Sequence, residues 1–145
     1  MKSAYDIANY FLKLSDEDSG ECLSNMKLQK LLYYAQGFHI ALHDTPLFED
    51  RILSWIHGPV VANVYYEYKK HGNSGIPAPE DIDISEFESS ETELLNDIFT
   101  VFGQFSAWKL RDLTHEEPPW KDTPNGGEIS HAKLKEYFIT QLENG

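Results

Sequence analysis

Cysteine, basic side chains and long apolar runs are all scarce in this sequence, and each scarcity excludes a class of protein. The single cysteine, Cys22, has no partner for an internal disulfide, so we expect a cytoplasmic, reducing environment. No apolar run approaches the roughly 18 residues that a membrane-spanning helix needs. The 12 Lys and Arg against 24 Asp and Glu give a net charge of −12, which disfavours direct binding to nucleic acid or to anionic membranes.

The motifs that hold nucleotides and metals are missing as well. Neither GxxxxGK[ST] nor GxGxxG occurs, so nucleotide binding has no support. His39 and His43 stand four residues apart, the spacing of two zinc ligands on one helix face. However, Ile40 stands where HExxH sites have their glutamate, and no third ligand is indicated. We therefore expect neither a metal nor a cofactor.

The acidic residues are concentrated in two stretches without Lys or Arg, residues 16–21 and 80–97. Together they contain 12 of the 24 acids, so the rest of the chain is formally neutral. The stretches are expected to lie mainly in loops between helices. There they either aid solubility or steer association with a basic partner. Both readings stay open for the candidate steering residues Glu80, Asp81, Asp83, Glu86 and Glu88.

What the chain has in abundance is helical periodicity. With 145 residues, 41% of them hydrophobic, it suits one domain, 1–145, with its own core. Apolar spacing predicts a mainly α fold of about six helices, with a short β-hairpin or extended arm around residues 47–56. The expected helix starts are Ser3, Ser24 or Asn25, Pro59, Ser90 with Glu93 as a capping box, Ser106, and Ser130.

The predicted second helix, which ends near His43, is apolar around most of its girth and is expected to be central. Lys27 and Lys30 lie off its main apolar stripe. The polar segment 15–21 is expected to end the first helix, and Gly72 the third.

Three histidines, His39, His57 and His115, are the candidates for acid–base chemistry, because imidazole titrates near neutrality. None is accompanied by a placed nucleophile. Ordinary structural roles explain each of them, as a core or boundary residue for His39, in a turn for His57 and at a helix end for His115. A hydrolase that uses these histidines is the alternative to a binding protein.

Tyrosine and tryptophan exceed what the core stripes require, and both are favoured at protein–protein interfaces. Some of them either form the rim of the core or contact a partner, and the sequence leaves both open. The candidate partner-binding residues are Tyr34, Trp55, His57, Tyr65, Trp108, His115 and Trp120.

Three blocks of the sequence resemble the Panacea domain family, which includes SocA-type antitoxins and GepA-like phage-associated proteins. The blocks are NMKLQKLLYYAQGFHIALHDTPLF, WIHGPVVANVYYEYKKHG and FSAWKLRDLTHEEPPW, in that order. One departure is Phe38, where an indole is common in the family.

The resemblance implies an α-helical antitoxin of a bacterial or phage-borne toxin–antitoxin pair, and not an enzyme. Its partner would be a cognate toxin, encoded by an adjacent gene, which it neutralises by direct contact. Some members are similar to adaptors that deliver the toxin to a cytosolic protease. A phage–host interaction protein without a toxin is a further alternative.

Overall fold

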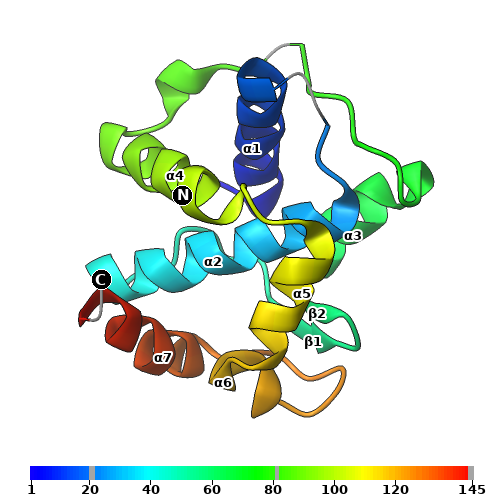
Figure 1. The fold of residues 1–145 in the computed structure, drawn as a ribbon. Coiled ribbons are helices and arrows are strands. Elements are labelled where there is room, and N and C mark those ends of the chain that lie inside the picture. Colours follow the sequence, from blue (N-terminus) through cyan, green and yellow to red (C-terminus); the bar gives the residue numbers. More distant parts are fainter. Residues whose placement is uncertain (20–21, 81, 144–145) are drawn as a thin grey trace.

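The computed structural model describes residues 1–19, 22–80 and 82–143, and helices make up most of it (Figure 1). This confirms the predicted mainly α fold, as one compact body with a small hairpin. None of the described helices is both long and apolar enough to cross a membrane. The elements are α1 (Ala4–Ser19), α2 (Asn25–His43), β1 (Leu53–Trp55), β2 (Gly58–Val60), α3 (Ala62–Tyr68), η1 (Lys69–His71), η2 (Ile84–Glu86), α4 (Ser89–Phe102), α5 (Ala107–His115), α6 (Pro118–Lys121) and α7 (His131–Glu143).

Helix α2 is the centre of the fold, as its apolar girth predicts. It contacts α1, α3, α4, α5, α7 and β2, and Figure 1 shows it crossing the middle of the molecule. Every residue from 28 to 37 is buried. Because the other elements surround this part of the helix, most of its polar side chains need hydrogen-bond partners within the protein.

The side chains of two glutamines of α2 form hydrogen bonds with backbone groups of neighbouring segments. The Gln36 Oε1 atom accepts from the backbone N–H groups of Leu47 (2.7 Å) and Phe48 (3.3 Å), and its Nε2 donates to the Phe48 carbonyl (2.8 Å). The Gln29 Oε1 atom accepts from the Val61 N–H at 2.9 Å. These side-chain bonds fix the loop after α2 and the start of α3, where these backbone groups have no partner from regular secondary structure in the described part of the chain.

Most of the predicted helix starts are confirmed. The hydroxyls of Ser24, Ser106 and Ser130 accept from the backbone N–H three residues later, at 3.1–3.2 Å. Two details were wrong. Helix α1 continues through residues 15–19, and α4 begins at Ser89 with the Glu91 carboxylate accepting from the Glu88 N–H at 2.9 Å.

The hairpin is confirmed near residues 47–56, but its second strand occupies the place predicted for a helix start. Ser54 pairs with Pro59 in the antiparallel β1–β2 register, and α3 starts only at Ala62. Gly58 has a φ of +118°, where a side chain would be strained, and a Cβ there would lie 2.6 Å from Lys30 Cε. Close packing on α2, rather than local propensity, makes this segment extended.

We expect a Gly37→Ala variant to be less stable, although alanine is normally better than glycine in a helix by about 1 kcal/mol. Its Cβ would overlap the ring of Phe138 on α7, so we expect a loss of about 1–3 kcal/mol in urea unfolding. The double variant with Phe138→Leu makes room for the methyl group and should be less destabilised than the two single effects summed. Additive effects, or a gain in stability from Gly37→Ala alone, would contradict this packing.

Candidate functional site

A cavity of about 490 Å³ opens between the hairpin, the start of α2, α3 and α5. Four of the predicted partner-binding residues line this cavity, namely Trp55, His57, Tyr65 and Trp108. Trp55, His57 and Tyr65 come from one continuous segment, the hairpin and α3, whereas Trp108 comes from α5, much later in the chain. The tertiary fold brings this segment and α5 together around the cavity.

Exposed apolar side chains surround this cavity. Ile56, Tyr66 and Trp108 are 70%, 61% and 59% exposed. The Trp55 and Tyr65 rings meet edge to face at 5.1 Å between centroids, and Tyr65 meets Tyr66 in the same way at 5.4 Å. We call Trp55, Ile56, Tyr65, Tyr66 and Trp108 the aromatic surface. Ring packing holds Trp55, Tyr65 and Tyr66 together on the hairpin and α3, and Trp108 extends the surface from α5.

His115 and Trp120 support this surface from behind. Their rings stack at 4.0 Å and 6°, and Trp120 Nε1 donates to the Trp55 carbonyl at 2.7 Å. Burial lowers the pKa of His115, and the positive Arg111 adds to the effect. His115 Nε2 is buried and has no hydrogen-bond partner among the described residues. These two residues fix the position of the hairpin on α5 and α6.

Tyr34, the remaining predicted partner-binding residue, belongs to the core. Only 1% of its surface is exposed. Its ring stacks on Phe102 at 3.9 Å, and its hydroxyl donates to Glu117 at 2.9 Å. Tyr34 therefore cannot contact a partner in this conformation. The sequence did not reveal this because adjacent tyrosines on a helix normally point in different directions.

Glu117 joins three helices through tyrosine hydroxyls. Tyr33 and Tyr34 donate to its two carboxylate oxygens at 2.9 Å each, and Tyr137 of α7 donates as well. Burial raises the pKa of Glu117 to about 7, although the three hydroxyls oppose the rise. Burial and the nearby carboxylate also raise the pKa of Tyr137 to about 12.

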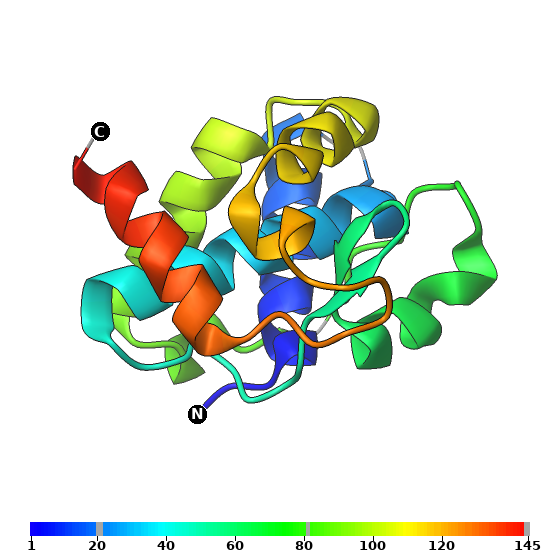
Figure 2. The same cartoon turned by 90° about the horizontal axis from the view of Figure 1, so that it is seen from below.

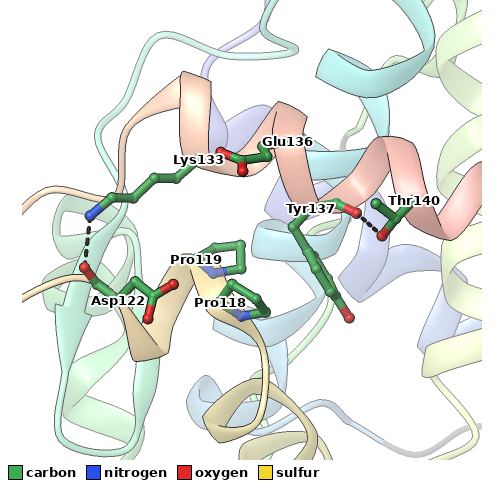
Figure 3. A pocket seen from close by; sticks show the side chains of 7 residues that line it. All are labelled: Pro118, Pro119, Asp122, Lys133, Glu136, Tyr137 and Thr140. Atoms are coloured by element: carbon green, nitrogen blue, oxygen red, sulfur yellow. Dashed lines mark hydrogen bonds between the residues drawn. The ribbon is translucent and has the colours of Figure 1, made fainter.

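A second hollow of about 360 Å³ lies between α6 and α7 (Figure 3). Pro118, Pro119 and Tyr137 form its apolar wall. Lys133 Nζ donates to the Asp122 carbonyl at 2.8 Å across it. These contacts link α6 to α7 near the Glu117 cluster and give the hollow a structural role.

Lys30 was expected to lie off the apolar stripe of α2, and this was wrong. Only 1% of its surface is exposed, and it lines the cavity floor beside Gly58. Burial, reinforced by Arg111, lowers the pKa of Lys30 to about 7. Within residues 1–19, 22–80 and 82–143, no hydrogen bond or ion pair holds its ammonium group. Sequence reasoning missed this residue because lysine is almost never fully buried.

The three candidate histidines do not converge. His57 is exposed on the hairpin, where its Nδ1 accepts from Arg111 Nε at 3.2 Å. His39 lies nine residues beyond Lys30 along α2, about 13 Å away, with its Nδ1 2.7 Å from the Thr45 carbonyl. The described part of the chain contains no group of three His, Cys, Asp or Glu residues that could hold a metal ion.

The candidate steering acids lie away from the aromatic surface. Glu80, Asp83, Glu86 and Glu88 are exposed, and Asp81 falls outside the described residues. Phe87 packs on Tyr10 of α1 at 5.1 Å. Figures 1 and 2 both show the loop that carries η2 well separated from the hairpin. Any effect of these acids on a partner at the aromatic surface would be long-range.

Comparison with known proteins gives one match. A family model described as "Antitoxin SocA-like, Panacea domain" matches residues 28–121. The match spans the buried part of α2, the hairpin, α3 and α5, and so includes all the described walls of the cavity from Lys30 onward. Neither the curated proteins nor the solved structures that were searched contain a match.

We expect the stability of the protein to rise with pH between about 7 and 10 because of Lys30. Its folded pKa is about 7, against 10.5 in an unfolded chain, so unfolding takes up a proton in this window. The free energy of unfolding should rise by up to about 1.4 kcal/mol per pH unit. Lys30→Met should remove this slope and raise stability at pH 7, measured by urea unfolding.

Lys69→Met, on the exposed rim of the same cavity, is the matched control and should keep the slope. Glu117 has the opposite effect on the free energy of unfolding, which it lowers as the pH rises, and it acts at lower pH than Lys30. Its folded pKa is raised, so its contribution is lost as pH rises from about 4.5 to 7. Measurements between pH 7.5 and 9.5 therefore isolate Lys30, and an unchanged slope in Lys30→Met would refute its assignment as a buried, ionisable group.

Proposed function

The chain belongs to the SocA-like antitoxin family with a Panacea domain, and we propose that it neutralises a toxin protein by binding it directly through the aromatic surface. The observation that carries this proposal is the cluster of exposed rings around one cavity. Interface hot spots are enriched in Trp and Tyr, and they lie where neighbouring groups exclude water.

The architecture beneath this surface supports a binding role. The Trp120 hydrogen bond and the His115–Trp120 stack hold the hairpin in one position, and the Gln29 bond to Val61 holds the start of α3. A pre-organised surface loses less conformational entropy when a partner binds. The proposal assigns no catalytic role to His39, His57 or His115.

The partner proposed is the product of an adjacent reading frame, met in the cytoplasm. Co-expression should relieve the growth arrest that this product causes, and the two chains should co-purify. Two routes of neutralisation are distinguished by the fate of the toxin. Delivery to a protease shortens the toxin's half-life, whereas steric neutralisation leaves its abundance unchanged. Continued growth arrest without any complex would refute the proposal.

We expect Trp108→Ala to weaken toxin binding by about 2 kcal/mol, roughly 30-fold, because Trp108 is an exposed member of the aromatic surface. Isothermal titration calorimetry would measure this change. Leu42→Ala is the control, since Leu42 is 51% exposed at the far end of α2. Both variants should keep the circular dichroism and melting temperature of the parent. Equal affinities for the two variants would place the interface elsewhere.

The acidic loop is proposed to steer the toxin before contact. Glu80→Gln with Glu86→Gln should slow association several-fold at low salt and leave dissociation unchanged, because charges outside the contact area act at long range on the on-rate. Stopped-flow measurements at about 0.02 M and 0.5 M salt test this, since screening at high salt should remove the difference. An on-rate insensitive to both mutation and salt would leave the loop with a solubility role.

A further inference from the structure

Lys30 is the exception among the buried polar side chains of α2. Asn25, Gln29 and Gln36 are hydrogen-bonded to each other or to backbone groups, and the Tyr33 and Tyr34 hydroxyls donate to Glu117. The Lys30 ammonium, 1% exposed as a residue, has no such partner in the described residues. An unpaired buried charge is among the most destabilising features of a fold. A ligand that pairs with this charge would therefore gain a large part of its binding free energy from the contact.

The residues that line the cavity above Lys30 indicate which charge this ligand carries. Its described lining contains Lys30, His57 and Lys69 but no Asp or Glu, although acids outnumber bases two to one in the chain. Arg111 lies close enough to Lys30 to lower its pKa, and it reaches over the Trp108 ring at 5.1 Å. The floor and wall of the cavity are therefore positive, and they attract an anion.

We propose that the cavity receives one carboxylate of the bound toxin, from an Asp or Glu side chain or the chain terminus, which forms an ion pair with the Lys30 ammonium. This rests on the proposed function and adds the chemistry of the contact. Among the basic residues of the described lining, Lys30 alone is buried, whereas His57 and Lys69 are exposed. The single charge of Lys30 complements that of a carboxylate.

The surroundings favour a carboxylate on a protein over a free anion. The mouth of the cavity is flanked by Ile56, Tyr66 and Trp108, all largely exposed. A partner chain that covers these side chains would exclude water from the ion pair and strengthen it. A small anion would leave them exposed, and the open cavity would screen its charge.

The decisive comparison is toxin binding by Lys30→Met and Lys69→Met. Methionine keeps the apolar stem of Lys30 and removes its charge, and unfolding measurements confirm first that the variant is folded. We expect Lys30→Met to raise the Kd at least 30-fold, mainly through faster dissociation, and Lys69→Met to change it less than three-fold. A Kd for Lys30→Met within three-fold of the parent overturns the inference and leaves the proposed function intact.

Proton uptake gives a second readout that a merely structural role for Lys30 would not produce. At pH 8 the Lys30 side chain of the free protein is largely deprotonated, because its pKa is about 7, and pairing with a carboxylate should restore its proton. Calorimetry in two buffers of different ionisation enthalpy should show close to one proton taken up, and none for Lys30→Met. The other ionisable groups that line the cavity or couple to Lys30 are His57, His115, Lys69 and Arg111.

A third experiment tests whether free anions bind in the cavity. Acetate and inorganic phosphate are titrated into the free protein while the Lys30 ¹³Cε resonance is followed by NMR. We expect only weak binding, with Kd values above about 10 mM. Phosphate binding below about 0.1 mM that competes with the toxin would overturn the inference in favour of a free-phosphate site. If the parent chain binds no toxin at all, the proposed function fails and this inference fails with it.

Discussion

The burial of α2 on every side is the constraint on which the rest of the structure depends. Residues 28–37 are all buried, and the polar groups among them, apart from Lys30, find partners on other elements or within α2. Gln36 fixes the loop at Leu47 and Phe48, and Gln29 fixes the start of α3. The polar side chains of one helix thereby determine where the surrounding segments lie.

The same constraint links stability to the site. Tyr33 and Tyr34 hold Glu117 at the junction of α5 and α6, and the adjoining Trp120 holds the hairpin through the Trp55 carbonyl. The aromatic surface is thus fixed to the core by a short chain of contacts. Lys30, which has no such partner in the described residues, lies where this network meets the cavity. Its unfavourable burial is consistent with a residue kept for binding rather than for folding.

Local signals in the sequence were enough to predict most of the helices. Serine caps start helices because their hydroxyls satisfy N–H groups within one turn, and that chemistry needs no knowledge of the tertiary structure. Four of the seven predicted partner-binding residues line one cavity, since excess Trp and Tyr is a compositional signal of an interface. Pro59 was misread because pairing with Ser54 and the close packing of Gly58 on Lys30 outweighed its preference for a helix start. The polar composition of residues 15–19 did not end α1.

The sequence by itself determined the helical class, the central position of α2, most helix starts and the family, because periodicity, capping and motif order are all local properties. Only the tertiary structure decided which polar residues are buried and what they contact. Tyr34 became a core residue and Lys30 the floor of a cavity, since burial depends on elements far away in the chain. An unpaired charge is recognisable only when all its neighbours are known, and for this reason the candidate anion site became visible only in the folded molecule.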